Sequence, residues 1–242
     1  MTLAERARGV WYLWMNDRYA DETEIAELAR ALARSTNPCL LLPDFWQIEK
    51  WQRLHDAVDE LGWERLMVLR DGEHVRAVDE AAFEAASPDS RFSRHDRAVD
   101  IGMALNEAGT ISAPGQAILR EFFAFAVLTP ALATWISEIL GGLAVKVGSV
   151  EFSRYRDGDF IAPHDDCVGA RRCNLVSYLD VSNNQRDGGA LRVSGEIGEA
   201  VFQPRFNTAV LLPLAPTNRH WVEPWRATLG RKTVSVSFVD AD

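Results

Sequence analysis

The sequence predicts a mainly β protein whose N-terminal half gives helical support. From Ala144 onward, apolar residues recur at every second position in short runs separated by Gly, Asn, Asp and Pro, which is typical of a sandwich or barrel. Before that point, apolar residues recur at helical spacing. The 242 residues are enough for one sizeable core. We therefore expect one domain over 1–242, with mostly helical support over 1–142 and the β core over 143–242.

Three helices are predicted in the N-terminal half, and we expect them to pack on the outside of the sheet. Asp21 and Glu24 resemble a capping box, which opens a helix that continues to Ala33 and is stopped by Asn37-Pro38. A short strand over 39–45 leads into a second helix at about 47–61. Thr129-Pro130 opens a third helix, which ends at Gly141-Gly142. Five tryptophans in this half are expected in the core or in a homodimer contact: Trp11, Trp14, Trp46, Trp51 and Trp63.

The segment from about Arg70 to Ala113 is charge-rich and has little sustained periodicity. Long excursions of this kind are usually mobile surface or a functional lid. From the residues alone both interpretations stay open, and a lid over about 70–113 is what the resemblance given below favours.

Six strands are predicted in the C-terminal half. Within one of them, Leu191 and Val193 are expected to line the barrel, with Arg192 outside. Gly188-Gly189 indicates either a plain turn or a close backbone approach. The six runs are 144–155, 173–181, 190–193, 208–214, 218–223 and 233–239.

Composition excludes several classes of protein. A net charge of −9 and a pI near 5.1 argue against a nucleic-acid surface, which needs a basic stripe. The longest apolar stretch, from Phe122, is too short to span a bilayer, and the N-terminus lacks a signal-peptide pattern. We therefore expect no nucleic acid, no membrane and a cytoplasmic location. Cys39, Cys167 and Cys173 follow no zinc spacing and are expected to be free thiols, with thiolate coordination as the minor alternative for the last two.

The candidate metal site consists of His164, Asp166 and His220. Residues two apart on a strand point to one side, so His164 and Asp166 can share a metal while Asp165 points away. Two imidazoles and one carboxylate hold one face of an octahedral Fe(II) and leave the other face open for a co-substrate and dioxygen. This set predicts an oxygenase site, with the third ligand on a distant strand.

The run from Arg231 to Val239 alternates as a β-strand, with Arg231, Thr233 and Ser235 on one face. An arginine in this position can hold a carboxylate through two hydrogen bonds. The other three histidines, His55, His74 and His95, are expected to be surface or capping residues.

The C-terminal ninety residues resemble the prolyl hydroxylase-like branch of the Fe(II)/2-oxoglutarate dioxygenases. Several motifs match in order: YRDGDFIAPHDD from Tyr155, RRCNLVSYLD from Arg171, GGALRV from Gly188, VFQPRFNTAVLL from Val201, HWVEPW from His220 and RKTVSVSF from Arg231. This resemblance implies a double-stranded β-helix, the jelly-roll barrel of that superfamily. Ordered blocks of this kind are more specific than any one motif.

The resemblance also implies roles for individual residues. His164, Asp166 and His220 would bind Fe(II), and Arg231 would pair with the far carboxylate of 2-oxoglutarate. The other residues expected around the co-substrate are Tyr155, Tyr178, Thr233, Ser235 and Leu191. In two places the chain departs from the family pattern, with Asn174 in place of a threonine and Asp180 in place of the asparagine of a "YLN" strand. Both departures bear on substrate identity.

The reaction implied is oxidative decarboxylation of 2-oxoglutarate with O2, giving succinate and CO2, coupled to hydroxylation of an aliphatic C–H. The carboxylate ligand Asp166 favours hydroxylation over halogenation, because halogenases of this superfamily lack it. We expect a small amino acid-like substrate whose carboxylate meets Arg171 or Arg172, with Asn174 nearby; Arg154 is a further cation close to the site. The alternative for these arginines is solvation or pairing with Asp157, Asp159 and Asp187.

Other functions remain open from the sequence. A peptidyl or protein hydroxylase of the same family would need an exposed groove. A zinc hydrolase can use the same three ligands, and a cupin-type dioxygenase works without 2-oxoglutarate, but both leave Arg231 without a purpose. A non-catalytic binding or sensor protein would keep both the fold and the site.

Overall fold

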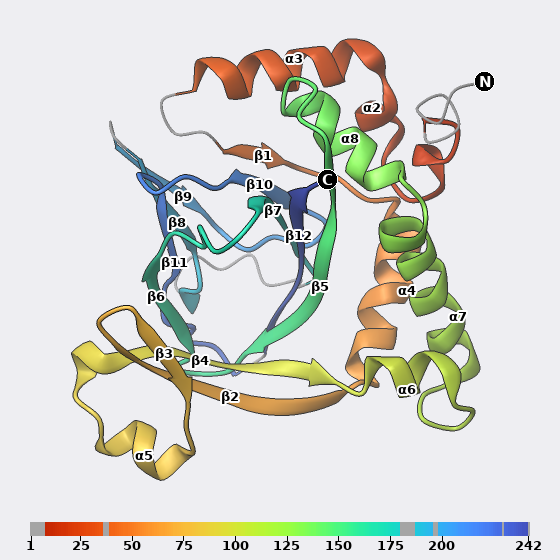
Figure 1. Cartoon of the computed structure of the whole chain (residues 1–242). Coiled ribbons are helices and arrows are strands. Elements are labelled where there is room, and N and C mark those ends of the chain that lie inside the picture. Colours follow the sequence, from red (N-terminus) through yellow and green to blue (C-terminus); the bar gives the residue numbers. More distant parts are fainter. Residues whose placement is uncertain (1–7, 36–38, 180–186, 196–197, 229, 242) are drawn as a thin grey trace.

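Twelve strands form one antiparallel sheet in the described part of the chain, which curls into a nearly closed barrel (Figure 1). The computed structural model describes residues 8–35, 39–179, 187–195, 198–228 and 230–241. The order along the sheet is β1-β10-β7-β12-β5-β4-β6-β11-β8-β9, with β2 paired to both β3 and β4.

The barrel has two walls. The first wall contains β5 (Val145–Tyr155), β12 (Arg231–Asp240), β7 (Arg171–Tyr178) and β10 (Ala209–Pro213), with β1 (Leu40–Leu42) at its edge. The second contains β6 (Phe160–His164), β11 (Arg219–Val222), β8 (Leu191–Ser194) and β9 (Glu199–Phe202). From β5 to β12 the chain changes wall at each successive strand except between β8 and β9, which pair within the second wall, and this is the arrangement of a jelly roll. The predicted mainly β fold with a double-stranded β-helix core is confirmed.

The helices cover the outer face of the first wall (Figure 1). They are α2 (Asp17–Ala20), α3 (Glu22–Arg34), α4 (Ile48–Asp59), α6 (Ile101–Asn106), α7 (Ala113–Phe123) and α8 (Ala131–Ile139), with short turns η1 (Trp11–Leu13) and η3 (Ala124–Leu128). Their apolar sides pack with outward-facing residues such as Phe152, Val234 and Val236 in one large core. The three predicted helices are present, and α7 is an additional one.

Local details of these helices follow the predicted chemistry. The Asp21 side chain accepts hydrogen bonds from the backbone N–H groups of Thr23 and Glu24, so it caps α3 as expected. The predicted stop at Asn37-Pro38 lies outside the described residues. Trp51 of α4 donates from Nε1 to the carbonyl of Tyr178 over 2.9 Å, which ties the helical layer to β7. Of the five tryptophans, all except the half-buried Trp63 are buried.

The predicted excursion over 70–113 is largely wrong, because the segment supplies part of the barrel. It contains the end of β2 (Gly62–Asp71), β3 (His74–Ala77), α5 (Glu80–Ala85), the 3-10 turn η2 (Pro88–Ser90) and β4 (Arg91–Val99). Strand β4 pairs with β2 along one edge. Its other edge pairs with β5 at Asp96 and Arg97 and with β6 at Ser93 and Arg94, so it joins the two walls. A lid role for the remainder of this segment stays a prediction.

Strand β4 was not predicted, because charged residues interrupt the alternation of apolar residues along it. Asp96 is fully buried and pairs with Arg65, Arg154 and Arg156 at 3.1, 2.7 and 2.7 Å. Asp159 is equally buried and pairs with Arg65. Buried charges persist in a core only when they are paired in this way. The strand is therefore anchored by ion pairs where an ordinary strand shows apolar residues.

A smaller core lies inside the barrel. Leu191 and Val193 belong to it, whereas Arg192 points outward and bonds to Glu199 and Glu223, as predicted. No single helix in the described ranges is long and apolar enough to cross a membrane; 113–128 and 131–139, bent by 50°, pass that test only as a pair.

Candidate metal and co-substrate site

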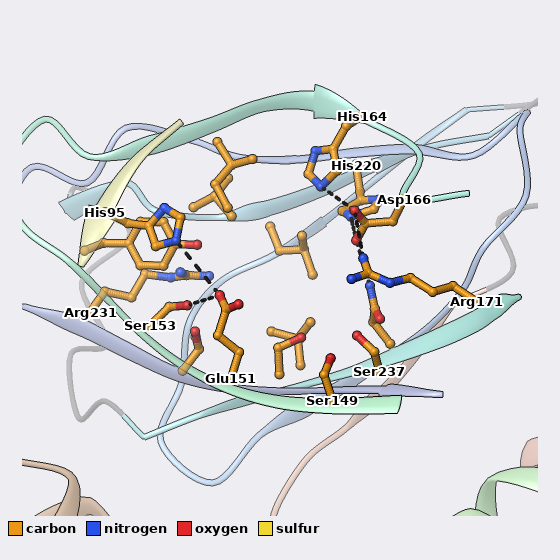
Figure 2. Close-up of a pocket in the computed structure, with 18 residues that line it drawn as sticks. His95, Ser149, Glu151, Ser153, His164, Asp166, Arg171, His220, Arg231 and Ser237 are labelled. Atoms are coloured by element: carbon orange, nitrogen blue, oxygen red, sulfur yellow. Dashed lines mark hydrogen bonds and ion pairs between the residues drawn. The ribbon is translucent and has the colours of Figure 1, made fainter. Parts of the chain in front are cut away.

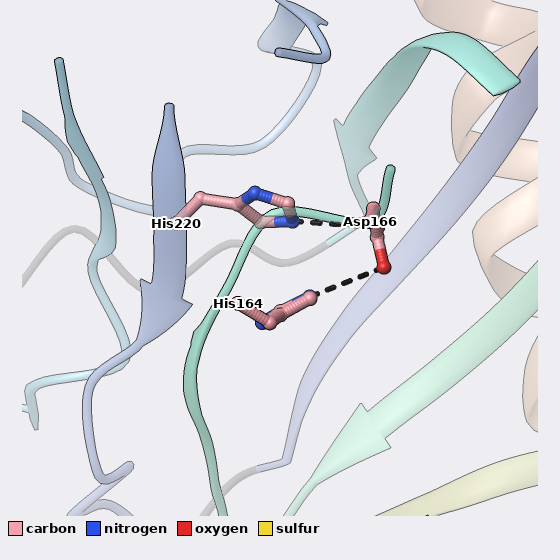
Figure 3. A group of neighbouring side chains, drawn as sticks. All are labelled: His164, Asp166 and His220. Atoms are coloured by element: carbon pink, nitrogen blue, oxygen red, sulfur yellow. Dashed lines mark ion pairs between the residues drawn. The ribbon is translucent and has the colours of Figure 1, made fainter. Parts of the chain in front are cut away.

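Strands β6 and β11 bring the two candidate histidine ligands together. His220 lies opposite His164 in the antiparallel register, and their ring centroids are 4.1 Å apart. The Nε2 atoms of His164 and His220 each lie 3.4 Å from a different oxygen of Asp166 (Figure 3). The ligand atoms of all three residues lie within 4.8 Å of one another, so a single ion can contact all three.

Asp166 reaches this position through a turn, which corrects the expected strand alternation. Strand β6 ends at His164, and Asp166 has a left-handed backbone with φ 57°. The Asp165 carboxylate accepts a hydrogen bond from the Cys167 N–H, so it is turned away as predicted. Because a non-glycine residue in this backbone region carries strain, the surrounding contacts must hold Asp166 in place.

The protonation states suit metal binding. His164 Nδ1 lies 2.9 Å from the Ala162 carbonyl, which can only accept, so Nε2 carries the lone pair that faces Asp166. Burial, followed by the neighbouring His220, lowers the pKa of His164 to about 4. Burial alone would raise the pKa of Asp166, but the hydrogen bond to His220 and nearby positive charge hold it below its usual range. Neutral imidazoles and an ionised carboxylate are the forms that bind metal ions.

Arg231 lies at the far end of the same cavity, on β12. Its side chain is 1% exposed, and Nε and Nη1 have no hydrogen-bond partner among the described residues. The guanidinium lies over the rings of Tyr155 and Tyr178, 4.5 and 5.1 Å from their centroids. A buried cation without an anion is costly. Its free donors therefore fit an anionic ligand that enters the cavity.

The register of β12 is the predicted one. Arg231, Thr233 and Ser235 all line the cavity. Lys232 points the other way, where it bonds to Asp59 of α4 over 2.6 Å and contacts His55. The alternation expected from the sequence is thus confirmed at this strand.

Tyr155 and Tyr178 are buried beside Arg231 as expected. Burial raises the pKa of Tyr155 to about 12 and also raises the pKa of Tyr178, so both hydroxyls stay protonated and can donate to an anion. Tyr155 lines the cavity, and the buried Tyr178 hydroxyl has no hydrogen-bond partner among the residues that the structure describes.

The cavity that joins these groups has a volume of about 210 Å³ (Figure 2). Arg171 and Asn174 line it close to Asp166: Asn174 donates to Asp166 over 2.9 Å, and Arg171 Nη1 lies 3.7 Å from that carboxylate. Leu191 lines the opposite wall, as expected.

Two of the candidate arginines are not at the site. Arg172 is exposed and pairs with Asp240 over 2.5 Å, because strand alternation turns it to the outer face. Arg154 points away from the cavity to Asp96 and lies over Trp63. Both arginines therefore pair with acids, but the partners are Asp240 and Asp96, and the expected partners Asp157, Asp159 and Asp187 are wrong for these two.

Among the cavity residues that were missed from the sequence, His95 and Glu151 are the two with ionisable side chains. His95 was expected on the surface, but it is 5% exposed and stacks on Tyr155 at 5.5 Å. Glu151 projects into the cavity from β5, where its carboxylate accepts a hydrogen bond from Ser153. Counting back from Tyr155 in steps of two along the predicted strand would have found Glu151 and Ser153. No sequence signal marked His95.

The cysteines do not join the metal ligands. Among the described residues, the one ligand cluster is that of His164, Asp166 and His220. Cys173 is buried in the outer core, and burial raises its pKa to about 12, whereas Cys167 is exposed. A buried neutral thiol is a poor ligand. The alternative of thiolate coordination is therefore wrong for Cys173, and all three cysteines are free thiols.

Comparison with known proteins agrees with this geometry. Residues 150–239 match the family model described as "2OG-Fe(II) oxygenase superfamily". The match covers the strands that carry the three candidate ligands and Arg231. Over these residues the chain matches the 2OG-Fe(II) oxygenases, so the resemblance noted in the sequence is confirmed. This family uses Fe(II), 2-oxoglutarate and O2, and the three-ligand cluster and the unpaired Arg231 fit the first two.

Solved structures share the fold. A 2OG-Fe(II) oxygenase-family oxidoreductase from Burkholderia pseudomallei is 16% identical, with a TM-score of 0.59 over 92% of this chain and 93% of that one. A Pseudomonas putida prolyl-4-hydroxylase is 18% identical, with a TM-score of 0.58 over 90% and 99%. A Trichoplax adhaerens prolyl hydroxylase in complex with a hypoxia inducible factor peptide fragment is 16% identical, with a TM-score of 0.58 over 93% and 96%. No curated protein matches the sequence.

Proposed function

We propose that this oxygenase hydroxylates an aliphatic C–H of a small amino acid-like metabolite, with His164, Asp166 and His220 as the Fe(II) ligands and Arg231 as the anchor of 2-oxoglutarate. The observation that carries the site assignment is the buried, unpaired guanidinium in the same cavity as the ligand cluster. When bound, Fe(II) supplies the activation of dioxygen that couples decarboxylation of 2-oxoglutarate to hydroxylation.

The chain's own residues position the reactants. Arg231 can give two charge-assisted hydrogen bonds to the far carboxylate of 2-oxoglutarate, with the Tyr155 and Tyr178 hydroxyls and Thr233 beside it. Leu191, Ile161 and Val222 give the cavity an apolar side that limits water around the co-substrate. The carboxylate of Asp166 stays ionised, held by Asn174 and Arg171.

The size of the cavity supports a small substrate. Its volume of about 210 Å³ lies below the range of roughly 300–1,000 Å³ that is usual for ligand pockets. Arg171 is 39% exposed, lines this cavity and offers a cation for a substrate carboxylate. Arg172 has no part in this proposal, because it lies outside.

A peptide substrate is the alternative, because one structural neighbour is described in complex with a peptide fragment. A zinc hydrolase and a cupin-type dioxygenase leave the buried Arg231 unexplained. A non-catalytic sensor would bind the same ligands without consuming them, so turnover of 2-oxoglutarate separates it from an enzyme.

The metal assignment is tested anaerobically with Fe(II) and 2-oxoglutarate. We expect one Fe(II) per chain and the weak visible charge-transfer band of a chelated 2-oxo acid. His164→Ala and Asp166→Ala should each abolish the band. A normal band in both variants would show that the ligands are misassigned.

The substrate class is tested by succinate release. Free amino acids should stimulate consumption of 2-oxoglutarate, and Arg171→Ala should weaken that stimulation while Arg172→Ala leaves it unchanged. Stimulation by peptides alone, unaffected by Arg171→Ala, would refute the small-molecule proposal.

A further inference from the structure

The wall of the cavity that faces the candidate iron ligands is polar. Alternate residues of β5 and β12 form it, and their side chains project inward because the two strands pair in register (Figure 2). Ser153, Glu151 and Ser149 of β5 pair with Thr233, Ser235 and Ser237 of β12 in that order. A row of hydroxyls around a single carboxylate is the lining of a polar ligand site and differs from an apolar core.

Glu151 is the acid in this wall that the proposed chemistry does not use. The acids that line the cavity are Glu151 and Asp166, and Asp166 belongs to the ligand cluster. Ser153 donates to Glu151 Oε1 over 3.0 Å, and His95 Nε2 lies 4.0 Å from the same oxygen. No lysine or arginine in the described ranges lies within ion-pair distance of Glu151. Its carboxylate is therefore oriented by Ser153 and is open to a cationic group of a ligand.

The position of Glu151 indicates that its partner is not 2-oxoglutarate. Both ends of 2-oxoglutarate are anionic, and a carboxylate beside them is repulsive. The Glu151 side chain is 46% exposed and lies on the open side of the cavity, whereas Arg231 is 1% exposed at the closed end. Glu151 therefore marks the part of the cavity left for the substrate.

Two cavity residues of opposite charge, Arg171 and Glu151, are not assigned to 2-oxoglutarate and can contact the substrate. Arg171 projects from the side of Asp166, and Glu151 projects from the facing wall (Figure 2). With Arg231 assigned to 2-oxoglutarate, this pair of charges complements a molecule that carries both a carboxylate and an ammonium group. An internal residue of a peptide carries neither group.

We propose that Glu151 is the specificity-determining residue that binds the ammonium group of a free amino acid, whose carboxylate is bound by Arg171. This inference rests on the proposed function and narrows its substrate class to zwitterions. The neighbouring His95 lies 4.0 Å from Glu151, and because burial lowers its pKa, the imidazole is not a cationic partner of this carboxylate at neutral pH.

The experiment compares free amino acids with analogues that lack one charge. Isothermal titration of the anaerobic Fe(II)–2-oxoglutarate protein uses α-amino acids, amino acids with a more distant amine, their N-acetyl forms and their amides. We expect free amino acids to bind, and N-acetylation to weaken binding by about tenfold, as expected for loss of a charge-assisted hydrogen bond that stays partly exposed to water. The same order should appear in succinate release.

The variant that isolates the acid is Glu151→Gln, which keeps the shape and removes the charge. It should weaken binding of free amino acids by about tenfold, leave N-acetyl forms unchanged and preserve the 2-oxoglutarate band. Glu64→Gln is the matched control, because Glu64 is an exposed acid on β2 outside the cavity. It should behave as the unmodified protein.

The outcomes separate the two proposals. Equal binding of free and N-acetylated compounds, or unchanged binding in Glu151→Gln, would overturn the role of Glu151 alone. Loss of Fe(II) and 2-oxoglutarate binding by the unmodified protein would overturn the proposed function. Absence of any amino acid binding to a protein that binds 2-oxoglutarate would overturn the role of Glu151 and also the small-molecule substrate class, while leaving the Fe(II) and 2-oxoglutarate assignments in place.

Discussion

Asn174 of β7 donates a hydrogen bond from Nδ2 to Oδ2 of Asp166, 2.9 Å away. Asp166 lies in the left-handed turn after β6, and the amide of Asn174 reaches it across the cavity. The backbone of Asp166 is strained, and its carboxylate is held by the amide of Asn174, which is a neutral donor. Partners of this kind orient metal ligands and tune their affinity.

Asn174→Ala should weaken Fe(II) binding by roughly 10–100-fold, the usual effect of removing a hydrogen bond to a ligating side chain. The dissociation constant measured by anaerobic titration with Fe(II) checks this. Arg172→Ala is the control, because Arg172 lies on the outer face of the same strand and pairs with Asp240. Equal constants for Asn174→Ala and the unmodified protein would show that Asp166 needs no such support.

Arg231→Ala should raise the Michaelis constant for 2-oxoglutarate by about a hundredfold or more, since truncation of one partner of a buried charge pair costs roughly 2–5 kcal/mol. Fe(II) binding should survive, because the ligand cluster lies at the other end of the cavity. Lys232→Ala should leave the Michaelis constant unchanged, because Lys232 contacts Asp59 and His55 outside the barrel. A larger effect of Lys232→Ala would contradict the register of β12.

Gly189→Ala should also weaken 2-oxoglutarate binding, although Gly189 is not expected to touch the co-substrate. A Cβ at this position would lie 2.6 Å from the Trp225 ring and 2.9 Å from Cδ of Arg231, so the arginine would have to shift. Steady-state kinetics on 2-oxoglutarate measures the result, a raised Michaelis constant.

Gly72→Ala is the matched control for this prediction. Gly72 has a similar positive φ of 60°, but a Cβ there meets nothing within 4 Å. Both variants pay the backbone strain of a left-handed non-glycine residue, roughly 1–3 kcal/mol. Only Gly189→Ala should change the Michaelis constant, and equal kinetics for the two would indicate that Arg231 adjusts freely.

The stability of the metal-free protein should fall as the pH falls below about 6.5. The pKa of His164 drops from 6.5 to about 4 on folding, so the unfolded state binds more protons between these values. The contribution is complete above pH 6.5 and is lost by pH 4, a change of about 3 kcal/mol from this residue. His95, whose pKa is also lowered by burial, acts in the same direction.

Urea unfolding at several pH values measures this dependence. His164→Asn should reduce the slope by at most about 1.4 kcal/mol per pH unit within the window, because asparagine does not titrate. The same slope in both proteins would mean that His164 titrates normally when folded.

The features of the fold and of the candidate site that depend on periodicity and on ordered motifs could be predicted from the sequence. The inward row Arg231, Thr233 and Ser235 follows from strand alternation, and the opposition of His164 and His220 follows from a third ligand on a separate strand. The role of Asp166 was predicted for the wrong reason, because a left-handed turn after the strand directs its side chain. A turn of this kind is set by contacts that the local sequence does not show.

Strand β4 and His95 could not be predicted because their stabilisation is tertiary. The charges of this strand are neutralised by arginines from β2 and β5 and from the residues that follow β5, and these partners become visible only when the chain is folded. Arg172 was misplaced for a simpler reason, since neighbours on a strand face opposite ways and the register of β7 was not known.

Two distant parts of the chain form the cavity, because β4 contributes His95 to its lining. The region that matches the oxygenase family begins at residue 150, yet His95 reaches the cavity from well before it. Transplanting the segment 62–99 between relatives would exchange His95 and the strand that carries it, while leaving the three candidate iron ligands, Arg231 and Glu151 in place. In evolutionary terms, the surroundings of Glu151 can diverge along a stretch of chain that is separate from the stretch that carries the candidate ligands.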